Sequence, residues 1–267
     1  MLLKKSKYRD IFNSNFNLSF HRPKKDQCLI CVNYAMKLKQ GSVTEEEERA
    51  YKRHTELKIR AKKEKAADKE MAKKDQTKHV VTLDLQAVLP TPCGLVSQLY
   101  YKRKLSVYNF TIYSLADGKA TCFVWDESNG KRGSVEIASC LLLYLQSLPV
   151  TVREIVLYSD CCGGQNRNQY LVAAFLYALE SIPNICSITH KYLETGHTQM
   201  ECDSMHSAIS FAQKASPVFT PSGWDIIFQM ARRSNPYMVI PIRFNQILDF
   251  KHLASQVIRN TKVDKQK

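Results

Sequence analysis

From residue 78 onward, strand-like and helix-like stretches follow one another in an order that few architectures can accommodate. Runs of β-branched and other apolar residues predict strands at 79–85, 105–114, 119–125, 154–159 and 185–192. Helices are predicted over 134–148, with Ser134 as the N-cap, over 168–181, and from a start between Thr198 and Asp203. Three successive strands favour an antiparallel meander, and the later alternation of helix and strand favours parallel right-handed crossovers. The sequence therefore predicts a mixed α/β sheet flanked by helices, closed by a short helix (222–233) and strand (237–242).

The chain before residue 78 differs in composition. Residues 1–41 mix basic and aromatic side chains without a sustained period, so little independent folding is expected there. Thr44 and Glu47 have the spacing of a capping box, and charged residues continue to about Lys74 without glycine or proline. This pattern predicts a long helix that acts as a solvated spacer or basic rod. We divide the chain into a basic segment (1–43), a charged helix and linker (44–77), the α/β domain (78–253) and a basic tail (254–267).

The charge of the chain indicates what it binds. Lys and Arg number 39 against 25 Asp and Glu, a net charge of +14, and residues 1–79 hold 21 basic but only 11 acidic side chains. Such an excess favours a polyanionic partner, and nucleic acid above all, although it also suits a surface that merely keeps a protein soluble. No apolar run is long enough to cross a bilayer and no signal peptide opens the chain, so we expect an intracellular protein without a membrane partner. The DNA partner suggests the nucleus.

Three aspartates stand at the ends of predicted elements. Asp84 closes the first strand, Asp160 closes the fourth, and Asp203 lies near the start of the third helix. Carboxylates that meet at one edge of a sheet suit Mg²⁺ or Mn²⁺, although acids at such places also cap helices. Glu194 and Glu201 are rivals for the third position, since a helix containing both Glu201 and Asp203 points them about 200° apart.

Three blocks carry a resemblance to a known family. They are VVTLDLQAVLPTP at 80–92, YSDCCGGQNRN at 158–168 and GHTQMECDSMHS at 196–207. Over residues 20–253 the chain resembles transposon-derived proteins with an RNase H-like core. The resemblance implies an RNase H-like mixed sheet, and it implies that Asp84, Asp160 and Asp203 match the catalytic triad of a DDE/D-type transposase. It also favours Asp203 over Glu201.

These observations predict transposase-like hydrolysis or strand transfer of a DNA phosphodiester. The three aspartates would hold two Mg²⁺ or Mn²⁺ ions roughly 3.5 to 4 Å apart, which activate the nucleophile and stabilise the leaving oxygen. The alternative is a domesticated, catalytically inactive DNA-binding protein, and a third reading is a transposon remnant that folds incompletely. The partners considered are DNA and a second copy of the chain in a homo-oligomer, and the sequence leaves the oligomeric state open.

Other polar residues near the aspartates are candidates for substrate binding. Gln165, Asn166 and Asn168 follow Asp160 on a loop that leads into a helix, where amides can hold a phosphate. The alternative is that Asn168 simply caps the helix. His197 and His206 flank Asp203, and each could orient a carboxylate or contact a phosphate, or be structural.

A CxxC pair lies in the basic segment. Cys28 and Cys31 have the spacing of half a tetrahedral zinc site, and His21, His54 or a segment upstream would have to complete it. The nine cysteines of an intracellular chain are otherwise expected to be reduced thiols.

Overall fold

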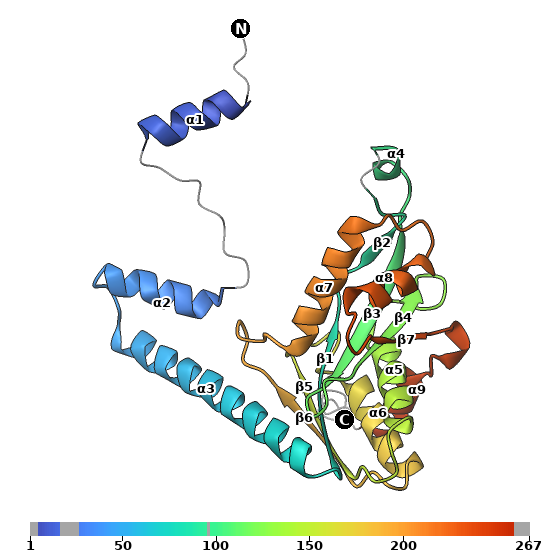
Figure 1. The fold of residues 1–267 in the computed structure, drawn as a ribbon. Coiled ribbons are helices and arrows are strands. Elements are labelled where there is room, and N and C mark those ends of the chain that lie inside the picture. Colours follow the sequence, from blue (N-terminus) through green and yellow to red (C-terminus); the bar gives the residue numbers. More distant parts are fainter. Residues whose placement is uncertain (1–4, 17–26, 95–96, 259–267) are drawn as a thin grey trace, which may run out of the picture.

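The computed structural model describes residues 5–16, 27–94 and 97–258, and their centre is a mixed seven-stranded sheet (Figure 1). The strands are β1 (Lys78–Leu85), β2 (Leu89–Thr91), β3 (Leu105–Ser114), β4 (Ala120–Asp126), β5 (Glu154–Ser159), β6 (Ser187–Tyr192) and β7 (Met238–Pro241). Their order is β6-β5-β1-β3-β4-β7, with β2 paired to the start of β3. The predicted meander β1-β3-β4 is antiparallel, and β5 and β6 run parallel to β1. The mixed α/β sheet is thus confirmed.

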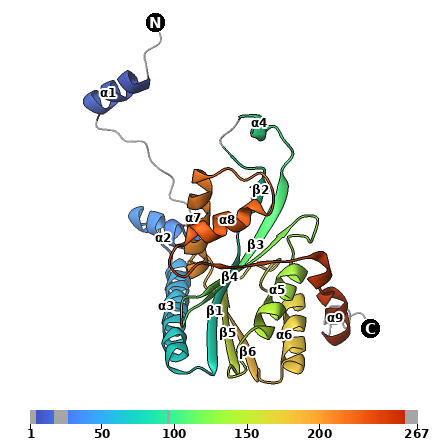
Figure 2. The same cartoon turned by 45° about the vertical axis from the view of Figure 1, so that its right-hand side comes forward.

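Helices cover both faces of this sheet (Figure 2). The helices after β4 are α5 (Ser134–Gln146), α6 (Gln169–Ser181), α7 (Glu201–Ala215), α8 (Gly223–Ala231) and α9 (Phe250–Val257). Helices α5, α6 and α9 bury one face, and α7 and α8 cover β3 and β4 on the other. The predicted helices are present, but the N-cap of α5 is Gly133, and Ser134 is its first residue.

Side chains alternate between these two layers along each strand. In β1, Val81, Leu83 and Leu85 belong to the core beneath α5 and α6, whereas Val80 packs in a smaller cluster on the opposite face. Asp84 therefore lies on the face that α7 covers. The sequence analysis missed β2, a three-residue strand whose middle residue is a proline that cannot donate to a ladder.

The N-terminal part is more ordered than its composition predicts. It contains α1 (Lys5–Asn15), α2 (Leu29–Lys39) and α3 (Glu45–Lys74). Little independent folding was expected over residues 1–41, and the helix α2 in this range packs on α3 through stacked rings of Tyr34 and Tyr51 with centroids 3.8 Å apart. The predicted capping box of Thr44 and Glu47 begins α3.

Helix α3 is not the solvated spacer that was expected, because one of its faces docks on the α/β domain. Asp68 is 6% exposed, accepts a hydrogen bond from the Tyr158 hydroxyl, and lies 2.7 Å from Lys191 Nζ. Ala72 packs in the same cluster as Val80. A helix of mostly charged residues can dock in this way because its buried carboxylate, Asp68, is paired with Tyr158 of β5 and Lys191 of β6.

The C-terminal boundary also differs from the prediction. Helix α9 runs through the expected domain end at residue 253, and Ala254 is buried in the core beside α5 and α6. A single-turn 3₁₀ helix, η1 (Phe244–Gln246), precedes it. Among the described residues, none of the helices has both the length and the apolar character that crossing a bilayer requires.

Candidate active site and a Cys/His cluster

Asp84 lies near the carboxyl end of β1, and Asp160 directly follows the parallel neighbouring strand β5. In the ladder between β1 and β5, Thr82 is paired with Tyr158. Two residues further along each strand stand Asp84 and Asp160, which by alternation face the same side as Thr82 and Tyr158. The carboxyl ends of parallel strands are where α/β proteins gather ligand-binding groups.

Asp203 reaches the same edge from the first turn of α7. The thiol of Cys202 contacts Thr82 at 3.5 Å, which seats the start of this helix on β1. One carboxylate oxygen of Asp203 accepts a hydrogen bond from the Met200 backbone amide at 2.7 Å, so Asp203 also caps the helix. One ligand atom each from Asp84, Asp203 and His206 lies within 4.8 Å of the others. The structure therefore brings together two of the predicted acids and one predicted histidine.

The hydrogen bonds of His206 determine which of its nitrogens faces the acids. The Thr111 hydroxyl donates to the Asp84 carbonyl oxygen at 3.0 Å, so its oxygen accepts from His206 Nε2 at 2.8 Å. With its proton on Nε2, His206 presents the lone pair of Nδ1 to Asp84 Oδ2, 3.7 Å away. Acceptors thus converge on the space between these side chains. The sequence analysis missed Thr111, because nothing local marks a threonine within a buried strand.

The electrostatics of the site reflect this crowding. Burial raises the pKa of Asp84 to about 7, and the negative charges of Asp160 and Asp203 act in the same direction, while Arg132 opposes them. Burial lowers the pKa of His206 to about 4, so its imidazole is neutral at neutral pH. A proton or a metal ion bound among these groups would relieve the repulsion.

The loop after β5 supports Asp160. Asn166, which is 1% exposed, donates from Nδ2 to Asp160 Oδ1 at 2.5 Å, and its own Oδ1 is buried without a hydrogen-bond partner among the described residues. Asn168 has the structural role that was weighed as the alternative, because its side chain accepts from the first amides of α6. Gln165 lies on the same loop, half-buried, and no contact assigns it a role.

The two rival glutamates are engaged elsewhere. Glu201 pairs with Lys65 of α3 at 2.6 Å, and Glu194 accepts from His54 Nδ1 at 3.0 Å. Helix α7 begins at Glu201 and contains both acids, so their side chains point in different directions, as the helical geometry predicted: Glu201 toward Lys65 of α3, and Asp203 toward Asp84 and His206.

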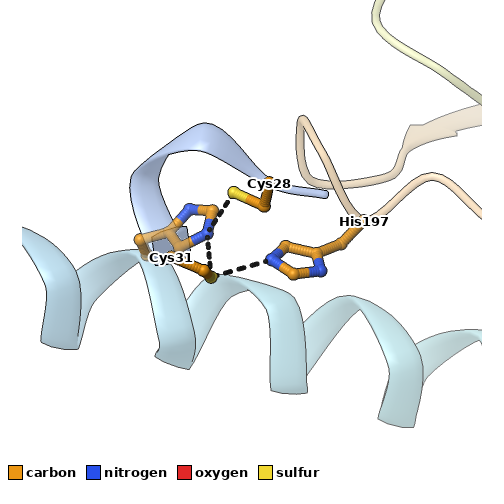
Figure 3. A group of neighbouring side chains, drawn as sticks. Cys28, Cys31 and His197 are labelled. Carbon is orange, nitrogen blue, oxygen red and sulfur yellow. Dashed lines mark hydrogen bonds between the residues drawn. The ribbon is translucent and has the colours of Figure 1, made fainter. Parts of the chain in front are cut away.

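A second cluster joins the N-terminal helices to the α/β domain (Figure 3). One ligand atom each from Cys28, Cys31, His54 and His197 lies within 4.8 Å of the others. His197 is thus misplaced in the sequence analysis: its Nε2 lies 3.3 Å from Cys31 Sγ, and it belongs with the thiols rather than beside Asp203. His54 was one of the two histidines considered for completing the CxxC pair, and His21 lies outside the described residues.

Comparison with known protein families finds a match for the larger part of the chain. The family described as "Domain of unknown function (DUF7869)" matches residues 105–267, more than half of the sequence. The chain belongs to the DUF7869 family. The DUF7869 match includes Asp160, His197, Asp203 and His206, and it begins after Asp84 and the CxxC pair. No curated protein and no solved structure matched the chain.

Proposed function

We propose that this DUF7869 protein catalyses divalent-metal-dependent hydrolysis or strand transfer of a DNA phosphodiester, as a transposase-type enzyme with an RNase H-like fold. The observation that carries the proposal is the meeting of Asp84, Asp203 and His206 within 4.8 Å, at an edge where the charge of Asp160 reaches the same carboxyl. Carboxylates that come from separate elements, here Asp84 of β1 and Asp203 of α7, are donors that hard divalent cations prefer.

The residues present fit such a cation. All three groups within 4.8 Å offer acceptors, and the unpartnered Oδ1 of buried Asn166 adds one more next to Asp160. Bound divalent ions stabilise charge in phosphoryl transfer and make an oxygen nucleophile more acidic. Asp84, Asp160 and Asp203 would hold the ions, with His206 as a further ligand. Asn166 fixes the Asp160 carboxylate, and the Thr111 hydroxyl fixes the imidazole of His206.

The arrangement of the sheet supports the RNase H-like part of the proposal. An antiparallel meander, β1-β3-β4, is extended on its other side by β5 and β6, both parallel to β1. The resemblance implies this combination, with one acid at the end of β1 and another at the end of the first parallel neighbour. Strand β7, parallel to β4, is an addition at the far edge.

Basic side chains on α3 favour a polyanionic substrate. Lys58, Lys62 and Lys65 of α3 line an open pocket of about 540 Å³ that extends toward Gln199, just before α7. The charge of Arg132 acts on Asp84 from another direction. A duplex carries closely spaced phosphates, and lysines spaced along one helix can follow them without reading bases. We therefore expect sequence-tolerant, salt-sensitive DNA binding next to the acids.

The test is cleavage and joining of labelled DNA by the full chain in the presence of Mg²⁺ or Mn²⁺. Wild-type protein should cleave or join DNA, and Asp84→Asn, Asp160→Asn and Asp203→Asn should each lower the rate by at least about 100-fold, because each loses a charged metal ligand. Glu201→Gln is the matched control, since it lies on the same turn of α7 but pairs with Lys65.

Each outcome discriminates between the readings. Rates that fall in Glu201→Gln but not in Asp203→Asn would show that the third acid is wrongly assigned. DNA binding without cleavage at any metal concentration would refute the enzymatic proposal and favour the domesticated DNA-binding protein.

A further inference from the structure

We propose that Cys28, Cys31, His54 and His197 form a structural zinc site that fastens the N-terminal helices to the loop leading into α7. The inference concerns a different set of residues from the proposed active site, and it does not depend on catalysis. The four side chains come from three places in the chain: the start of α2, the middle of α3 and the segment between β6 and α7.

The distances match a tetrahedral centre. Zinc bonds of about 2.3 Å to sulfur and about 2.0 to 2.1 Å to nitrogen, at tetrahedral angles, separate a sulfur and a nitrogen ligand by about 3.6 Å. His54 Nε2 lies 3.3 Å from Cys28 Sγ and 3.6 Å from Cys31 Sγ, and His197 Nε2 lies 3.3 Å from Cys31 Sγ. Figure 3 shows Cys28, Cys31 and His197 turned toward one another.

The hydrogen bonding of His54 prepares its ring for a metal. Its Nδ1 lies 3.0 Å from Glu194 Oε1, and a carboxylate can only accept, so Nδ1 carries the proton. The lone pair of Nε2 is then directed at both thiols. A carboxylate behind the far nitrogen of a histidine ligand is the usual support of a zinc site. Glu194, which the sequence offered only as a rival third acid, thus has a specific place here.

The backbone around the cluster is built for close approach. Gly196 has a φ of +79°, and a Cβ at this position would lie 2.8 Å from Cys28 Cβ and 2.9 Å from its Sγ. Only glycine allows the loop to turn this closely over the thiol. Cys28 is itself 6% exposed, and both cysteines of the pair are outside any disulfide, so both sulfurs are available to bind a metal.

Ligand chemistry selects zinc among the metals. Two thiolates and two imidazoles make a soft, four-ligand set with no free position, which is typical of structural zinc rather than of Mg²⁺ or a catalytic metal. The site would hold α2 on α3 and fix residues 193–200, the segment that sets the start of α7. Loss of the metal should loosen the packing of α2 and α3 and of residues 193–200, while the sheet remains folded.

The experiment uses reduced, metal-depleted full-length protein titrated with Co²⁺, a spectroscopic substitute for zinc. We expect about one equivalent to give thiolate-to-cobalt charge-transfer absorption that zinc then displaces. Such absorption requires sulfur ligands, so the Asp84, Asp203 and His206 group cannot produce it. Cys31→Ser and His197→Ala should abolish it, whereas Cys186→Ser, at an exposed cysteine outside the cluster, should retain it.

Glu194→Gln tests the site without removing a ligand, in case a ligand variant fails to fold. It should weaken zinc binding by about 10- to 100-fold. Absence of the absorption in wild-type protein, or its persistence in Cys31→Ser, would overturn the proposal. Asp84→Asn separates the two proposals, because it should keep the cobalt spectrum while losing DNA cleavage. If DNA cleavage is lost but the cobalt spectrum is intact, the zinc site is still supported. If the cobalt spectrum is missing from a protein that cleaves DNA, only the zinc site is refuted.

Discussion

Replacing Asp84 by asparagine should stabilise the metal-free protein. Burial, and then the charges of Asp160 and Asp203, raise the pKa of Asp84 from an ordinary 3.8 to about 7. At about 1.4 kcal/mol for each tenfold change in proton affinity, the ionised carboxylate destabilises the folded state by about 4 kcal/mol. Asparagine has nearly the same shape and no charge, so Asp84→Asn removes this cost.

The gain should depend on pH. Below about pH 4 the Asp84 carboxyl is protonated in the folded and the unfolded chain alike, and it contributes no difference. Between about pH 4 and pH 7 the unfolded chain ionises first, so the free energy of unfolding of the wild type falls as the pH rises. Above about pH 7 the loss is complete. The advantage of Asp84→Asn should therefore grow over this range and then stay constant.

Urea unfolding of metal-free protein at about pH 5 and about pH 8 measures this difference. Asp75→Asn is a control of opposite sign, because hydrogen bonds from Thr77 lower the pKa of Asp75 and its loss should destabilise the chain. Added Mg²⁺ should stabilise the wild type more than Asp84→Asn, since the variant has lost a charged ligand. If Asp84→Asn is less stable than the wild type at about pH 8, or if its advantage is the same at both pH values, the reasoning is refuted.

Three further variants test other parts of the structure. Asp68→Ala leaves a buried tyrosine hydroxyl without its acceptor and leaves Lys191 only the longer contact with Glu64 at 3.8 Å, so chemical denaturation should show a loss of about 3 kcal/mol. Gly196→Ala forces a left-handed residue against Cys28, and we expect a loss of about 1 to 3 kcal/mol together with weaker cobalt binding. Substituting both Lys58 and Lys62 by alanine should lower the slope of log affinity for DNA against log salt by about 2, and an unchanged slope would exclude α3 from the DNA interface.

The sheet apart from β2 could be predicted, because its other strands are marked by local runs of β-branched and apolar residues. β1 and β5 are runs of β-branched and apolar residues that end in aspartate, and their parallel pairing follows from the crossover between them. The charge of Asp160 acts on Asp84 because the two residues occupy equivalent places at the ends of neighbouring strands. The position of Asp203 was harder, since it depends on where α7 begins, and a contact from Cys202 to Thr82 across the sheet determines that start.

The Cys/His cluster shows where local patterns fail. His197 stands six residues before Asp203, so sequence proximity assigned it to the acids, yet its partner Cys31 is 166 residues away. Helix α3 was similarly predicted to be a solvated rod, because few of its residues are buried. These residues are polar or small, so they do not form an apolar stripe. A long-range cluster of paired polar groups has no period, and only the three-dimensional arrangement identifies it.

One short segment connects the Cys/His cluster with the group of acids. It therefore links the N-terminal helices α2 and α3 to the proposed active site at the sheet edge. Residues 193–203 contain Glu194 and His197 at the thiols and then Asp203 at the acids. Lys65 of α3 pairs with Glu201 in the same segment. The N-terminal helices therefore contact this segment both at the Cys/His cluster and at Glu201. If zinc fixes this segment, its removal should reduce protection from hydrogen–deuterium exchange across residues 193–203 and lower Mg²⁺ affinity at Asp203. Protection unchanged by metal removal would show that the Lys65–Glu201 pair and the contact of Cys202 with β1 suffice to position the third acid.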